Sequence, residues 1–138
     1  MPTLSQVVRS YVGTPFEHQG RKPGHGIDCV GLVVCGLMAL DLPIRDFTAY
    51  GGDSDPKILL AYVREFFDEV PIGQQQPDDV LMFWAVDPSK PQHVAIFTGT
   101  TMIHAFDRRA QKGKVREERI LPTRMEKLYG VFRYRRAA

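Results

Sequence analysis

Apolar positions have helical spacing in the first half of the chain and strand-like spacing in most of the second half. Residues 3–12 and 56–68 place apolar side chains on one helical face, which predicts two amphipathic helices, with Asp55 as the N-cap of the second. Residues 29–40 are apolar on every face. That pattern predicts a helix buried in the centre of the domain.

Short β-rich runs follow the helices. We expect strands at 79–86, 93–97 and 101–106 and within "KVREERIL" and "YGVFRYR", with a helical turn at 122–127. Because helices come first and strands afterwards, the order is typical of an α+β fold in which an antiparallel sheet packs on the buried helix. The chain of 138 residues fits a single domain, 1–138, since domains commonly have about 100 to 200 residues.

The start of the buried helix carries reactive chemistry, in the stretch "GHGIDCVGLV". Asp28 is a preferred N-cap residue, which places Cys29 at the first helical position. Unpaired backbone N–H groups and the helix dipole favour a thiolate there, so we expect the pKa of Cys29 to fall below about 7.5. The same N–H groups can hold an oxyanion. Gly31 allows a substrate or another stretch of backbone to approach closely.

Two histidines on neighbouring strands can serve this cysteine. A two-residue hairpin turn that starts at Gly99 places His104 opposite Ala95, and His93 then projects from the same face of the sheet. The arrangement predicts Cys29 as nucleophile, His93 as base and His104 as the group that orients the base.

Several short motifs resemble the NlpC/P60 family of papain-like cysteine peptidases. They are "GTPF" with "QG", "DCVGLV", "DDVLMFW", "HVAIFTG" and "IHA", in the family's order. The variant "PFEHQGR…DCVGLV" is most similar to the branch encoded with phage tails and gene transfer agents. The resemblance implies a papain-like fold and the same roles for Cys29, His93 and His104.

The resemblance also implies a substrate, namely short peptides of the bacterial cell wall, often cut after a γ-D-glutamyl residue next to meso-diaminopimelate. Phe16 and Val30 stand where relatives have a tyrosine and a serine that line the peptide cleft. Together with His18 and Asp28 they are the predicted substrate contacts. The mechanism requires no metal and no other cofactor.

Composition and charge bear on where the protein acts. No apolar run is long enough to span a membrane, and the N-terminus lacks the pattern of a signal peptide, so we expect synthesis in the cytoplasm and no membrane insertion. A phage-like tail particle would then carry the enzyme to the envelope, with a tail hub or tip protein as partner. Residues 108–138 are strongly basic; we expect a solvated face there and no nucleic-acid partner.

Three alternatives remain open at this stage. The chain can be a tail-assembly or plug module that keeps the fold without catalysis. The same thiol can serve an amidase or an acyltransferase. A metal site built from His18, His25, Cys29 and Cys35 is the weakest alternative, because these residues lack the usual zinc-ligand spacing. The two cysteines, six positions apart on one helix, are expected to be free thiols.

Overall fold

A six-stranded antiparallel sheet organises the structure, a computed structural model that describes residues 1–50, 56–108 and 111–136. The strands lie in the order β3-β8-β4-β5-β6-β7. They are β3 (Phe67–Val70), β4 (Val80–Trp84), β5 (Pro91–Phe97), β6 (Thr101–Arg108), β7 (Gln111–Arg119) and β8 (Leu128–Tyr134). A separate two-stranded ribbon joins β1 (Arg21–Lys22) to β2 (Gly26–Ile27).

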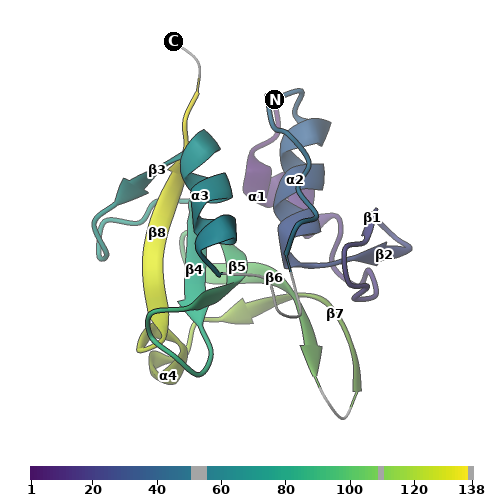
Figure 1. Ribbon diagram of the computed structural model, residues 1–138. Helices are drawn as coiled ribbons and strands as arrows, with labels where there is room; N and C mark the ends of the chain where they lie inside the picture. Colours follow the sequence, from purple (N-terminus) through teal and green to yellow (C-terminus); the bar gives the residue numbers. More distant parts are fainter. Residues whose placement is uncertain (51–55, 109–110, 137–138) are drawn as a thin grey trace.

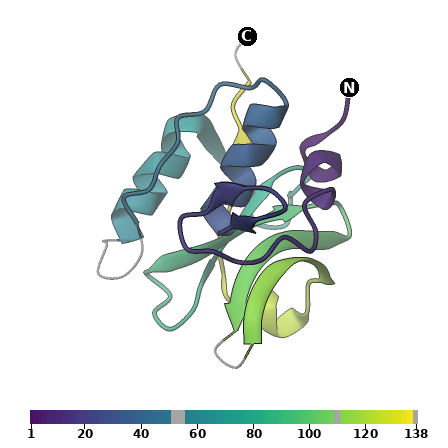
Figure 2. The same ribbon diagram turned by 90° about the vertical axis from the view of Figure 1, so that its right-hand side faces the viewer.

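Helices cover both faces of the sheet unequally. Figure 2 shows α1 (Leu4–Arg9), α2 (Cys29–Ala39) and α3 (Pro56–Phe66) on one side, and the short α4 (Pro122–Met125) on the other. The α+β fold with helices packed on an antiparallel sheet is therefore confirmed. The predicted N-cap Asp55 lies outside the described residues.

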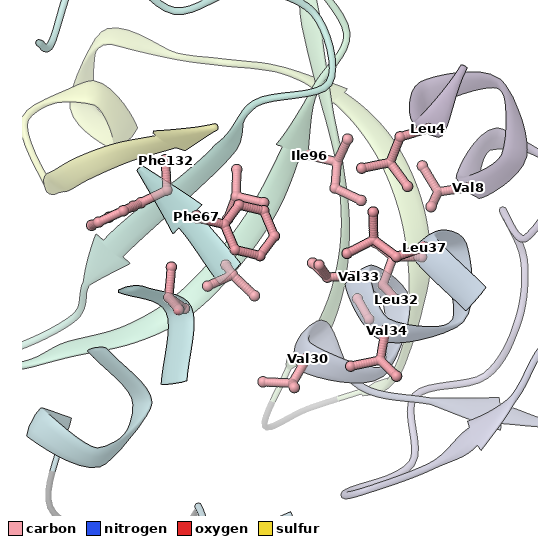
Figure 3. Close-up of a cluster of buried hydrophobic side chains, with 14 of the residues drawn as sticks. Leu4, Val8, Val30, Leu32, Val33, Val34, Leu37, Phe67, Ile96 and Phe132 are labelled. Atoms are coloured by element: carbon pink, nitrogen blue, oxygen red, sulfur yellow. The ribbon is translucent and has the colours of Figure 1, made fainter. Parts of the chain in front are cut away.

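The buried helix α2 forms the centre of the main core, as its apolar sequence predicts. Leu32, Val34 and Leu37 are each at most 1% exposed, and Figure 3 shows Leu37 near Leu4 and Val8 of α1 and near Ile96 of β5. A helix that is apolar all round is stable only where other elements cover every face.

The helix predicted at 56–68 ends two residues early. Phe67 begins β3 instead and pairs with Tyr134 of β8, with its side chain only 2% exposed. The helical pattern continues into this segment, but pairing with the sheet and burial of the Phe67 ring override it. The first helix is also shorter than predicted; Thr3 caps it and it ends at Arg9.

Because side chains along each strand point alternately to the two faces of the sheet, the sheet carries a separate apolar cluster on each face. Ile96 and Ile103 belong to the cluster on the side of α2, whereas Ala95 and Met102 belong to the cluster on the side of α4. Since successive side chains on a strand point to opposite faces, His93 shares a face with Ala95, and His104 shares it with Met102. Both histidines therefore project toward the face that carries α4.

Candidate active site

Asp28 holds the N-terminus of α2 in place. Its Oδ1 accepts hydrogen bonds from the backbone N–H of Gly31 at 2.8 Å and from Arg21 Nη1 at 3.0 Å. Its Oδ2 accepts from the backbone N–H of Gln19 at 2.7 Å and from the Tyr50 hydroxyl at 2.5 Å. The predicted N-cap is confirmed. Asp28 is only 2% exposed and both oxygens are engaged, so this geometry does not favour the predicted contact with a substrate.

Arg21 extends this anchor to the loop that precedes α3. Its Nε donates to Asp46 at 2.9 Å, and its Nη2 donates to the carbonyl of Phe47 at 2.7 Å and to the Tyr50 hydroxyl at 2.8 Å. One guanidinium thus joins the β1–β2 ribbon, the helix end and residues 46–50. The bidentate geometry that Arg offers suits such a junction.

Gly31 allows the same loop to lie directly against the helix. A Cβ atom on Gly31 would lie 2.3 Å from the carbonyl oxygen of Gly20. The close approach expected at this glycine is therefore made by the protein's own backbone.

The Cys29 sulfur is held at the edge of β5. The backbone N–H groups of Val94, Val30 and Cys29 itself are directed at the sulfur. The β5–β6 ladder has its last pair at Ile96↔Ile103, so Val94 lies just beyond it and its N–H is turned to the cysteine rather than to β6. This contact brings the sulfur next to the residue that follows His93.

The thiol is not activated as the sequence predicts. The pKa of Cys29 is raised to about 11, chiefly by burial and also by the negative charge of Asp28, whereas the three N–H groups act in the opposite direction. The expectation of a pKa below about 7.5 is therefore wrong for this conformation. Burial and the neighbouring carboxylate outweigh the helix terminus, because both disfavour a negative charge.

The two histidines meet as the hairpin register predicts. The pairs Ile96↔Ile103 and Phe97↔Met102 have the predicted register, and Gly99 has the positive φ of 110° that the tight turn needs. His93 Nε2 lies 2.8 Å from His104 Nδ1. The contacts of the described residues do not include a hydrogen bond between the Cys29 sulfur and the His93 ring.

Glu118 on β7 extends the pair to a chain of three side chains. His104 Nε2 lies 2.9 Å from Glu118 Oε2, and His104 itself is fully buried. Because a carboxylate only accepts, His104 donates from Nε2, and its Nδ1 accepts when the ring is neutral. His93 then donates from Nε2, which leaves a lone pair on His93 Nδ1. The chain therefore selects the tautomer that a general base needs.

The His93 ring is held neutral by its surroundings. The pKa of His93 is lowered to about 3, chiefly by burial and also by electrostatic interaction with His104 and Arg124. Phe83 and Phe106 lie beside the ring, with centroids 6.3 and 5.7 Å away. The resting site therefore contains a thiol and a neutral imidazole, not an ion pair.

A cavity of about 440 Å³ opens beside His93 on the α4 side of the sheet. Phe83, Trp84 and Phe106 supply aromatic surface, and residues 118–127 form the opposite wall. The sequence pattern contains no signal for this cavity, because its walls come from four strands and the turn at α4.

The other predicted contact residues lie elsewhere. Val30 is 4% exposed and packs in the main core. Phe16 is half-buried against that core, and its backbone N–H donates to the Gly113 carbonyl at 2.8 Å. His18 is exposed and contacts the Tyr50 ring edge-on, with centroids 5.9 Å apart. Their roles toward a substrate stay predictions.

Neither cysteine forms a disulfide, and both are free thiols. Burial raises the pKa of Cys35 as well, and its sulfur lies 3.4 Å from the Arg21 carbonyl. Within the described residues, no three His, Cys, Asp or Glu side chains gather as a metal site, so His18, His25, Cys29 and Cys35 are not brought together there. None of the helices described is long and apolar enough to cross a membrane.

A cysteine at the start of a buried helix, together with a histidine pair on the antiparallel sheet that this helix packs against, defines a papain-like domain. The model of the NlpC/P60 family matches residues 13–128, and the chain belongs to this family. A comparison with curated protein sequences finds no significant match.

Solved structures with this fold are distant in sequence. An NLP/P60-family lipoprotein-like protein of Staphylococcus aureus aligns with TM-score 0.70 and 17% identity over 97% of this chain and 41% of its own. The peptidoglycan hydrolase RipB of Mycobacterium tuberculosis aligns with TM-score 0.60 and 17% identity, over 100% of this chain and 70% of RipB. RipD of the same organism, a non-catalytic NlpC/P60 domain protein, aligns with TM-score 0.59 and 15% identity, over 96% of this chain and 98% of RipD.

The chain spans about two fifths of the length of the Staphylococcus aureus protein. At these identities the likeness establishes the fold alone.

Proposed function

We propose that this domain is a cysteine peptidase that hydrolyses short peptides of the bacterial cell wall. The observation that carries the proposal is the chain His93–His104–Glu118, which leaves His93 with one free ring nitrogen, next to Val94, whose N–H is directed at the Cys29 sulfur. A purely structural histidine pair has no need of a defined tautomer next to a thiol. The family and the hydrolase RipB support a peptidoglycan substrate.

The reaction is acyl transfer to water. The Cys29 sulfur attacks the amide carbonyl while His93 Nδ1 takes the thiol proton, and backbone N–H groups near the start of α2 hold the oxyanion. His93 returns the proton to the leaving amine. Water, activated by His93, then releases the acyl group from the sulfur. Because the resting pair is neutral, proton transfer accompanies attack rather than preceding it.

Incubation with muropeptides followed by mass analysis of the products tests this proposal. We expect two fragments whose masses add up to the mass of the substrate plus one water. Cys29→Ala or His93→Ala should lower turnover at least about 10²-fold, which is the usual contribution of a general base. An unchanged far-UV circular dichroism spectrum is the control for folding. Full activity of either variant would refute the assignments, and transfer to an added amine would indicate an acyltransferase.

A second candidate function is peptidoglycan binding without catalysis. The neutral thiol–imidazole pair favours it, because neither group is ready to react in the resting structure. RipD offers a precedent in the same fold. Muropeptide binding without any product over hours would support this candidate over the peptidase.

We further propose delivery by a phage-like tail, with synthesis in the producing cell's cytoplasm and a tail hub or tip protein as partner. The motif variant "PFEHQGR…DCVGLV" supports this placement. Immunogold labelling of purified particles tests it; absence of the protein from intact tails would refute it.

A further inference from the structure

The basic C-terminal segment gathers cations around the cavity beside His93. Arg119, Arg124 and Lys127 line it, and Glu118 is the acidic side chain among its lining residues. Glu118 already accepts from His104. The cavity therefore presents excess positive charge to whatever enters it.

Arg124 has the arrangement expected of a binding group. Its guanidinium carbon lies 5.8 Å from the centroid of Phe83 and 5.5 Å from that of Phe106, so two rings support it. In the described part of the chain it makes no ion pair, whereas Arg133 pairs with Asp79 and Arg135 with Asp68. Arg124 thus stays available to an anion from outside.

The direction of the reaction decides which part of a substrate occupies this cavity. The carbonyl carbon must reach the Cys29 sulfur, and the amine must lie where His93 can protonate it. Residues on the amine side of the bond therefore continue past His93. The cavity that His93 lines is the adjoining space on its α4 side.

This inference rests on the proposed peptidase function. We propose that the cavity binds the residue on the amine side of the cleaved bond, and that Arg124 binds a carboxylate carried by that residue. A guanidinium suits this ligand, because it can donate two parallel hydrogen bonds to a carboxylate. The rest of this substrate residue would contact the apolar rings of Phe83, Trp84 and Phe106.

A bound carboxylate also acts on the base. The positive charge of Arg124 is one of the causes that lower the pKa of His93. A negative charge beside Arg124 would offset that effect and make His93 a better proton acceptor. Binding of the correct substrate would then help to prepare the neutral site for attack.

A matched pair of peptides tests the carboxylate. The probes are L-Ala-γ-D-Glu-L-Lys with a free C-terminal carboxylate and the same tripeptide with a C-terminal amide. For the wild-type protein we expect kcat/KM to be about 10-fold or more higher for the carboxylate, as charge-assisted hydrogen bonds commonly provide. Arg124→Gln should lose that preference, so that the ratio of kcat/KM for the two peptides approaches one.

Arg136→Gln is the control, because it removes the same charge from an exposed position that does not line the cavity. It should leave the preference unchanged. Arg124→Lys keeps the positive charge but loses the two parallel N–H donors of the guanidinium. We therefore expect it to keep part of the preference for the carboxylate peptide. Equal kcat/KM for the two peptides in the wild-type protein would overturn the inference, as would an unchanged preference in Arg124→Gln.

A binding measurement separates this inference from the peptidase proposal. Calorimetric titration of the Cys29→Ala protein should give tighter binding of the carboxylate peptide than of the amide, and Cys29→Ala/Arg124→Gln should abolish the difference. If the wild-type protein cleaves neither peptide but this difference is found, the peptidase proposal fails and the carboxylate site stands. If neither peptide binds, or both bind equally, the carboxylate site is refuted.

Discussion

The two halves of the site differ in how they are held. On the helix side, Asp28, Arg21 and Tyr50 satisfy one another completely, and the loop lies against Gly31. On the sheet side, the His93–His104–Glu118 chain ends at a cavity with cationic walls. On the helix side, the polar groups that position the sulfur are fully hydrogen-bonded within the protein and are not available to a ligand. The second half keeps a free ring nitrogen and open space.

The difference indicates a division of labour within the site. A nucleophile at a helix terminus needs a rigid support, and a saturated buried network supplies it. A base must gain and lose protons and accommodate a leaving group, so its surroundings must remain accessible. The following predictions test that division, from the largest expected effect to the smallest.

Removing the anchor of the helix side should have the largest effect. Asp28→Ala leaves the Arg21 guanidinium and the Gly31 N–H without their carboxylate, and loss of one partner of a buried ion pair costs about 3–5 kcal/mol. Urea unfolding measures the change. Asp46→Ala is the matched control, because Asp46 binds the same Arg21 but its side chain is 45% exposed. Asp46→Ala should lower the free energy of unfolding by less than about 1 kcal/mol. Equal costs would contradict a rigid support centred on Asp28.

The thiol in the resting protein should react slowly. With its pKa raised to about 11 from the ordinary value of 9.0, Cys29 has about a hundredfold less thiolate at pH 7 than an ordinary cysteine. Alkylation by iodoacetamide in a Cys35→Ala background measures this, with the urea-unfolded protein as reference. The rate should rise about tenfold per pH unit from pH 7 toward pH 11, because only the thiolate reacts. Rapid labelling that is independent of pH near neutrality would reveal an ion pair with His93.

Changing the far end of the histidine chain should have a moderate effect. Glu118→Gln can donate as well as accept, so it no longer selects the His104 tautomer. We expect kcat/KM to fall about tenfold, as with other residues that orient a reactive group through a hydrogen bond. Nitrogen NMR of the histidine rings should show a mixed tautomer.

Glu117→Gln is the matched control on the same strand. Glu117 faces away from the histidines and binds Arg9 and Thr101. Loss of activity in this variant, or its absence in Glu118→Gln, would contradict a positioning role for Glu118.

The smallest effect is expected at Arg9. The Arg9 guanidinium and the Thr101 hydroxyl lower the pKa of Glu117 to about 2 from its ordinary value of 4.5. This depressed pKa contributes stability above pH 4.5 that is lost as the pH falls toward about 2. The pair is half-exposed, so Arg9→Gln should lower the melting temperature only slightly at pH 7, and less still at pH 3. Thermal unfolding at both pH values measures it; a larger cost at pH 3 would contradict this account.

Local signals in the sequence determined the fold class, the buried helix and the placement of the two histidines. Asp28 caps a helix through its own side chain, and alternation along a short hairpin brings His93 and His104 to one face. These features depend on near neighbours and on a turn of two residues. The predicted meeting of His93 and His104 follows from them.

Only the tertiary structure decided the chemistry of those groups and the members that complete the site. Glu118 reaches His104 through the pairing of β6 with β7, whose register depends on a hairpin that the sequence pattern does not specify. The pKa of Cys29 depends on how deeply the helix end is buried, a sum over distant residues that no motif reports. The cavity around Arg124 likewise exists because strands far apart in the chain meet there. Hydrogen bonding along the chain is local, whereas burial and charge are properties of the assembled fold.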